Sequence, residues 1–556
     1  MIEFYQSLYE LPFLQYELVA PVAGFLLDNL HWILLLFITH FTVLGIVAYL
    51  ILLERKTASW VQDRVGPNRT GFSFGLDFMP KFHFWGLGQP LADGLKFIVK
   101  EDYASKHVDK VLFTLAPMAM IITVIISIAV IPWGGTVGER VEGVDVKQYV
   151  KSALANDVPV GRAVVEKITG PDRAEFGFRR GNQIIGDVEL FVIPAGTNIA
   201  DVPPIRFDAE GRLEPGMQLP AAIGTRDRVL VSFVQGWHFQ IANLNIGVLF
   251  VLAALSLAVY GIVVGGWASN NKYSFLGGLR ATANMISYEI PLGLSVLIVV
   301  IMFATLDLGV IVSNQANYWF GVIPAWNVFA HPLAFFLFLI CIHAEANRAP
   351  FDNAEAEQEL VGGYHTEYSS MRFALFFLAE YAGMVTTSAV CVALFFGGWH
   401  LPYVDYLFPN LFGGGVDPAD RSIISAEFWF IAVLRFGIFL AKTVGILFIF
   451  IWVRWSLPRF RFDQIMQIAW RSMIPIGLLL VIGTTAVVVA FGGNTFGGLD
   501  ATQALAMLGM NVVVIGLLVI GRKLVPAAPD VNKKVRVPNS RFARTPVPKP
   551  LPATSA

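Results

Sequence analysis

Six acidic side chains and one arginine lie between Glu345 and Glu367, and two long apolar runs flank this stretch. Carboxylates held against a lipid bilayer are costly, so where they occur they are usually functional. In a low-dielectric setting such a crowd cannot ionise completely, and the group would titrate as a coupled set. We therefore predict that this acidic loop takes up or releases protons when a neighbouring molecule changes charge.

The spacing inside the loop allows two interpretations. Asp352, Glu355 and Glu359 recur at helical spacing and would share one helix face, whereas Glu357 would point elsewhere. Alternatively, because Asp352 follows Pro350, Asp352 and Glu355 would form the N-terminal cap of a helix and interact favourably with its dipole.

Two further acids lie inside apolar segments. Glu289 stands just before Pro291, which would kink a helix, and Glu380 stands between apolar residues and Tyr381. Helix capping explains neither position. We predict functional roles for both carboxylates.

Composition identifies the elements that must hold these acids. Of the 556 residues, 55% are hydrophobic and only 15% are charged, which is typical of a polytopic membrane protein. The two cysteines, Cys341 and Cys391, lie in separate apolar segments, and the chain has no Cys-x-x-Cys, Gly-x-Gly-x-x-Gly or Walker motif. Iron–sulfur clusters, dinucleotides and bound ATP are therefore not indicated.

Apolar segments long enough, or nearly so, to cross ~30 Å of hydrocarbon recur along the chain. We predict an all-α polytopic membrane protein with about nine transmembrane helices, the fifth being short, at residues 31–53, 110–132, 243–264, 281–306, 331–345, 371–396, 428–453, 473–491 and 503–521. Residues 1–30, 307–330 and 492–502 contain no Lys or Arg, whereas the connections on the other side are basic. The positive-inside rule predicts that the N-terminus is outside, and that the acidic loop and the C-terminus are inside.

The connection 133–242 interrupts this pattern. Apolar and polar residues alternate at 187–193, 204–207 and 228–233, and breakers separate these runs, which predicts a small β-rich external insert rather than a disordered one. The predicted units are therefore 1–132, with two helices and a large inner amphipathic loop; the insert 133–242; a seven-helix bundle, 243–521, with the acidic loop 345–370; and a basic, proline-rich inner tail, 522–556.

The inner loop after the first helix is basic. Arg64 and Arg69 flank the turn Gly66-Pro67-Asn68 and could aim two guanidinium groups at one spot, although arginines here could equally be anchors at the lipid headgroups. Further along, four apolar residues at helical spacing indicate an amphipathic helix lying along the membrane, namely Leu91, Leu95, Ile98 and Val99.

Several long motifs, in order, resemble the family of the H subunit (mitochondrial subunit 1) of respiratory complex I, the proton-pumping NADH:quinone oxidoreductase. They cover nearly all of the membrane part and include Glu54-Arg55-Lys56, Gly66-Pro67-Asn68-Arg69, Trp267-Ala268-Ser269-Asn270-Asn271-Lys272, Asn347-Arg348-Ala349-Pro350-Phe351-Asp352 and Pro458-Arg459-Phe460-Arg461-Phe462-Asp463-Gln464. The connection 72–88 is longer than the family's usual form, which implies a differently shaped entrance, and the insert 133–242 has no counterpart in that form.

The resemblance implies roles for particular residues. It implies that the quinone chamber and its entrance are lined by Arg55, Arg64, Arg461, Asp93 and Asp352. It also implies that the proton path and its coupling to the chamber involve Glu289, Glu345, Glu355, Glu357, Glu359, Glu367 and Glu380.

The resemblance further implies an enzyme subunit of the translocase type without a redox centre of its own. Its substrate would be a quinone such as ubiquinone, while FMN, NADH and iron–sulfur clusters would belong to partner subunits. Its partners would be the peripheral-arm subunits at the quinone site and neighbouring small membrane subunits, in a bacterial-type inner membrane.

Rival interpretations make different demands on the sequence. A homologous subunit of an ion-pumping hydrogenase would not need a quinone chamber. A free-standing ion transporter would have inverted repeats in its sequence, and we find none. A passive membrane anchor would leave Glu289 and Glu380 unexplained. For a haem protein, His331 and His343 would stand ~120° apart around their helix, so they do not share a face.

Overall fold

The computed structural model describes residues 30–70, 84–145, 163–170, 173–178, 183–184, 188–193, 205–207, 228–353, 357–403, 423–425, 429–491 and 501–524. The chain divides into two compact units, Met1–Asn511 and Val512–Ala556. Most of the predicted tail 522–556 lies outside the described residues. Glu355 also lies outside them.

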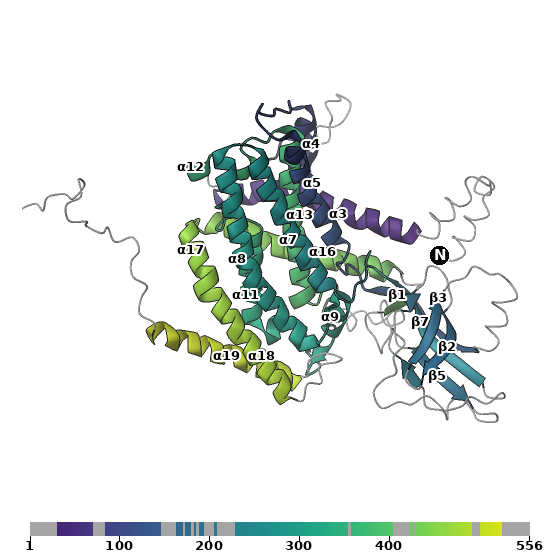
Figure 1. Cartoon of the computed structure of the whole chain (residues 1–556). Helices are drawn as coiled ribbons and strands as arrows, with labels where there is room; N and C mark the ends of the chain where they lie inside the picture. Colours follow the sequence, from purple (N-terminus) through teal and green to yellow (C-terminus); the bar gives the residue numbers. More distant parts are fainter. Residues whose placement is uncertain are drawn as a thin grey trace, which may run out of the picture. The chain divides into compact units, whose positions relative to one another are not determined.

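Within the described residues, eight helices are long and apolar enough to cross a membrane. They are α3 (Leu30–Val61), α5 (Lys110–Ile128), α7 (Gly247–Ala268), α8 (Lys272–Phe303), α13 (Ser370–Phe395), α16 (Trp429–Ser456), the continuous run from α17 (Phe462–Gln467) through the π-helical turn Ile468–Met473 to α18 (Ile474–Ala490), and α19 (Ala501–Leu524) (Figure 1). A shorter apolar helix, α11 (Pro332–Glu345), lies where the short fifth helix was expected. The predicted all-helical polytopic fold is confirmed.

Two helices begin earlier than predicted, because polar first turns hid their starts. Helix α8 begins at Lys272 rather than at residue 281, and the Asn271 side chain caps it by accepting a hydrogen bond from the Tyr273 backbone. The α17–α18 run begins at Phe462 rather than at 473. Hydropathy marks where a helix enters hydrocarbon, whereas capping marks where the helix starts.

The connections predicted on the inner side meet one another. Ser105, just before α5, donates to Glu367 at 2.7 Å, and Ser370, at the start of α13, donates to the backbone carbonyls of Phe97 and Lys100 at 2.9 Å. Phe97 lies in the last turn of α4 (Gln89–Val99), the predicted amphipathic helix, and Lys100 directly follows that helix. Loops far apart in sequence therefore form one surface.

The connections predicted on the outer side meet as well. Gln315, which follows the short helix α9 (Leu308–Asn314), donates to the Ala393 carbonyl at 2.9 Å, and the backbone of Tyr403 donates to the Tyr318 hydroxyl at 2.9 Å. Tyr318 belongs to a two-stranded sheet of β8 (Tyr318–Trp319) and β9 (Ile323–Pro324). Connections that the distribution of Lys and Arg predicted on one side of the membrane therefore contact one another.

The insert contains the predicted strands. One sheet has the order β10-β1-β7-β5-β6, with β4 also paired to β7, and a separate hairpin joins β2 to β3. The bounds are β1 Thr136–Asp145, β2 Ala163–Gly170, β3 Arg173–Phe178, β4 Gln183–Ile184, β5 Val188–Ile193, β6 Ile205–Phe207, β7 Arg228–His238 and β10 Ile423–Ser425. Because β10 comes from the α13–α16 connection and runs parallel to β1, the sheet is not built from the insert alone.

Small residues let α5 and α7 approach closely. A Cβ atom at Gly261 on α7 would lie 2.3 Å from the Met120 side chain and 2.9 Å from the Ala116 carbonyl oxygen of α5. Beside this contact, the rings of Phe113 and Tyr368 stack with centroids 3.9 Å apart. Close backbone approach at small residues is a common way for helices to associate in membranes.

We expect Gly261→Val to destabilise the protein by about 1–3 kcal/mol, because the added atoms push α7 away from the α5 backbone. The measurement is the free energy of unfolding in detergent micelles. Gly437→Val on α16 is the matched control, since a Cβ there meets nothing within 4 Å. Equal stability of the two variants would contradict the proposed close packing.

Candidate functional site

The centre of the acidic region is a buried ion pair. Arg348, in the turn after α11, donates from Nη2 to Oε2 of Glu380 on α13 at 2.9 Å, and the two side chains are only 4% and 6% exposed. Tyr364, in the short 3-10 turn Gly363–His365, donates its hydroxyl to the other oxygen of Glu380. Further hydrogen bonds to a buried ion pair offset part of the cost of removing its charges from water. The acidic loop is thus tied to α13.

A second pair joins this one through Tyr381. The Arg348 guanidinium lies over the Tyr381 ring, 4.4 Å from its centroid, and the Tyr381 hydroxyl donates to Oε2 of Glu54 at 2.5 Å. Arg454 of α16 pairs with the other oxygen of Glu54, which lies on α3. Helices α3, α13 and α16 therefore converge on one polar network in an otherwise apolar bundle.

A third pair holds the acidic loop against the turn after α16. Arg459 Nη2 lies 3.0 Å from Oδ2 of Asp352, which is buried, and the backbone of Phe460 donates to the Pro350 carbonyl at 3.0 Å. Asp352 and Arg454 both lie close enough to Glu380 to act on it electrostatically. We call the three pairs, Glu380–Arg348, Glu54–Arg454 and Asp352–Arg459, the acid–arginine cluster.

The predicted common helix face of Asp352, Glu355 and Glu359 is wrong for Asp352. Asp352 and Asn353 are not helical, and the described helix α12 spans only Glu357–Leu360. The carboxylate of Asp352 faces Arg459 instead, because a buried charge needs an opposite charge as its partner. Whether Asp352 and Glu355 cap a helix stays a prediction, since Glu355 and its neighbours lie outside the described residues.

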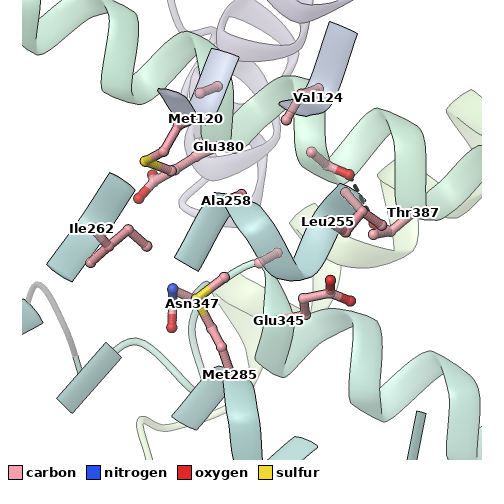
Figure 2. Close-up of a pocket in the computed structure, with 13 residues that line it drawn as sticks. Met120, Val124, Leu255, Ala258, Ile262, Met285, Glu345, Asn347, Glu380 and Thr387 are labelled. Carbon is pink, nitrogen blue, oxygen red and sulfur yellow. Dashed lines mark hydrogen bonds between the residues drawn. The ribbon is translucent and has the colours of Figure 1, made fainter. Parts of the chain in front are cut away.

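A small cavity separates the cluster from Glu345. Its volume is about 50 Å³, and it lies between α5, α7, α8, α11 and α13, with both Glu345 and Glu380 in its lining (Figure 2). Since a buried water needs roughly 10–15 Å³ of such space, the cavity can hold a few waters. Oε2 of Glu345 is buried and accepts no hydrogen bond within the described part of the chain. A water beside it would supply the missing partner.

Glu289 lies in the membrane-spanning part of α8, as predicted. Ser256 of α7 donates its hydroxyl to the Glu289 carboxylate, which is exposed on the isolated chain. Glu289 is also near enough to Glu345 for the two acids to repel each other. Thus Glu289, Glu345 and Glu380, which are far apart in sequence, follow one another across the bundle.

Other predicted acids lie in or near the connection between α11 and α13, outside the cluster. Glu367 accepts hydrogen bonds from Ser105 at 2.7 Å and from Asn271 at 2.8 Å, and Glu359 pairs with Arg280 at 2.5 Å on the surface. Of Glu357 the structure places only the backbone, in α12. Glu367 joins loops to one another, so its position also suits a purely structural role.

The predicted arginines are exposed at the surface and belong to none of the three pairs of the cluster. Arg55 pairs with Asp93 at 3.0 Å and so joins α3 to α4. Arg64 is exposed in the turn after α3, and Arg461 is exposed beside Asp463, 3.5 Å away, where α17 begins. The four apolar residues that predicted an amphipathic α4, Leu91, Leu95, Ile98 and Val99, are all exposed on the isolated chain. This face is free to contact lipid or a partner subunit.

Sequence reasoning missed several members of the network. Glu54 and Arg454 were seen only as parts of motifs or of basic connections, although a lone acid at the end of the apolar helix α3 was a usable signal. Tyr364 and Tyr381 carry no sequence signal of their own, because tyrosines are common in membrane helices. Burial, with its ring stacked on Phe113, raises the pKa of the nearby Tyr368.

The two histidines of the haem alternative make contacts within the protein. His331 lies 2.9 Å from the Thr484 hydroxyl, and the His343 ring stacks on Phe450 with centroids 3.7 Å apart. Within the ranges that the structure describes, no three His, Cys, Asp or Glu side chains gather as a metal site.

We expect Arg348→Met to destabilise the protein by about 3–5 kcal/mol, because Glu380 loses its charged partner in a buried site. The double variant Arg348→Met with Glu380→Gln should recover much of this loss, since the glutamine is neutral and still accepts from Tyr364. The free energy of unfolding in detergent micelles is measured for the single and the double variants. A double variant less stable than either single one would contradict this account of the pair.

Comparisons with known proteins all indicate the same protein family. The NADH dehydrogenase family matches residues 33–158 and 219–485, and the unmatched stretch between them falls inside the insert. The chain is 37% identical over 475 residues to an H subunit of NADH-quinone oxidoreductase from Koribacter versatilis, covering 85% of this chain and 99% of that protein.

Two further relatives bear the same subunit name. The protein from Cytophaga hutchinsonii is 35% identical over 452 residues, covering 81% of this chain and 95% of the relative. The protein from Leptospira biflexa is 37% identical over 454 residues, covering 81% and 93%. The relatives are matched over nearly their whole length, and the family match includes the segments that build the acid–arginine cluster, so the chain belongs to the NADH dehydrogenase family of H subunits of NADH-quinone oxidoreductase, respiratory complex I.

Proposed function

We propose that this chain forms the membrane-side wall of a quinone chamber and couples quinone reduction to proton translocation. The observation that carries the proposal is the buried acid–arginine cluster beside a cavity that also reaches Glu345. Family membership makes the chain a multi-pass membrane subunit of complex I, and supports a quinone enzyme over a hydrogenase subunit or a free-standing transporter.

The inner surface supports docking of a peripheral arm. The basic loop after α3, the acidic loop and the exposed apolar face of α4 all belong to the end where the inner connections meet. Partner subunits would carry FMN, NADH and the iron–sulfur clusters, and quinone would enter near Arg55, Arg64 and Arg461. This arrangement requires the N-terminus outside and the acidic loop and C-terminus inside a bacterial-type inner membrane.

The acids divide into two kinds, which suggests how a proton moves. Each carboxylate of the acid–arginine cluster has a guanidinium partner. Glu289 and Glu345 have no cation partner in the described part of the chain. We assign proton binding to Glu289 and Glu345, and to the cluster the sensing of charge.

Quinone chemistry supplies the change that this network would sense. Reduction of a quinone to a quinol takes two electrons, which partner subunits would deliver, and two protons. Negative charge developing on the quinone near Asp352 would disturb the neighbouring pairs. Because Asp352, Glu380 and Glu54 are linked by charges and hydrogen bonds, the disturbance would reach the cavity and Glu345.

We expect Glu289→Gln to lower quinone reductase activity and proton pumping strongly while the complex still assembles, because glutamine accepts the Ser256 hydrogen bond and cannot carry the proton. The complex is purified through a tag on this chain, and inhibitor-sensitive NADH-to-quinone electron transfer is measured together with pumping. Ser256→Ala is the control for the hydrogen bond alone. Normal turnover and pumping in a fully assembled Glu289→Gln complex would refute the assigned role.

We expect Tyr381→Phe to reduce coupled turnover several-fold, since it removes the hydroxyl through which Tyr381 links the Glu54–Arg454 pair to the Glu380–Arg348 pair. Assembly should be retained because the ring still packs under Arg348. Tyr260→Phe is the matched control, because that tyrosine is exposed on α7. If both variants turned over at the native rate, the link between the pairs would have no part in coupling.

A further inference from the structure

The turn that follows α13 has an unusual backbone. Gly397 and Gly398 both have left-handed φ angles, +64° and +51°. A Cβ at Gly397 would lie 2.5 Å from Nε1 of Trp326, and one at Gly398 would lie 2.6 Å from the Val312 side chain. Both positions therefore require glycine, for conformation and for space.

This backbone turns three carbonyl oxygens toward one point. The carbonyls of Phe396, Gly398 and His400 accept hydrogen bonds from Nζ of Lys442 at 2.7, 2.9 and 2.5 Å. The same nitrogen lies 4.4 Å from the centroid of the Trp326 ring. An ammonium group has three N–H donors, so each donor has its own carbonyl.

The ligands around Lys442 are those of a cation site. Carbonyl oxygens at a helix C-terminus carry partial negative charge, and an aromatic face attracts cations. Rings of backbone carbonyls hold monovalent cations in ion channels. Lys442 has no ion pair with a carboxylate within the described part of the chain, so carbonyls and one ring balance its charge.

We propose that the turn Phe396–His400 is a monovalent-cation site occupied by the chain's own Lys442 ammonium, which fixes the end of α13 to α16. The cluster joins these helices a second time, since α13 carries Glu380 and Tyr381 and α16 carries Arg454. Lys442 is thus a positioning residue: it sets how α13 lies against α16 at the C-terminal end of α13, beyond the cluster. This inference does not depend on the identity of the substrate.

The decisive experiment supplies the cation from outside. In the assembled complex, Lys442→Gly should lower the thermal midpoint by several degrees and reduce turnover. Adding n-butylammonium should restore most of both losses, whereas tetramethylammonium, which lacks N–H donors, should restore neither. Lys110→Ala, at an exposed lysine, is the control and should not respond to either amine.

Two further variants separate charge from volume and from hydrogen bonding. Lys442→Met keeps the aliphatic volume, and Lys442→Gln keeps donors without a charge, so both should resemble Lys442→Gly without the amine. A native midpoint and native turnover in either variant would overturn the proposal. An equal response of Lys442→Gly to both amines would also overturn it. If Lys442→Gly does not assemble, the Met and Gln variants alone decide.

Discussion

The bundle is organised by the need to place a guanidinium and a carboxylate, Arg348 and Glu380, where water is scarce. Each charge alone would be very costly there, and together they remain costly unless every leftover donor and acceptor is used. Tyr364 and the Tyr381 ring meet part of that demand. Because these groups come from the turn after α11, the turn Gly363–His365 and α13, satisfying one ion pair also fixes how the acidic loop folds.

Helix α13 is the element most affected by this constraint. Near its middle, Glu380 and Tyr381 join the cluster with α3 and α16, and at its C-terminal end its carbonyls receive Lys442 and the amides of Gln315 and Asn327. A helix held by polar contacts at two separate points has few alternative positions. Such rigidity suits a helix that keeps charged groups at set distances from one another.

The same physics divides the acids by their partners. Each carboxylate of the acid–arginine cluster has an arginine beside it, whereas in the described part of the chain Glu345 lines the cavity and Glu289 accepts a hydrogen bond from a serine. Under the proposed function, a change of charge at the substrate would be felt by acids whose protonation is still adjustable.

Sequence by itself determined the fold class, the membrane segments, the strands of the insert and the acids worth examining. Hydropathy, periodicity and the cost of buried charge are local properties, and Glu289 and Glu380 stood out for that reason. The sequence did not reveal which groups contact one another: Glu54 contacts Tyr381 and Arg454, β10 pairs with β1, and Lys442 contacts the end of α13. It also misplaced Asp352 on a helix face. Those contacts join residues tens to hundreds of positions apart, and only packing of the whole bundle decides which charge finds which counter-charge.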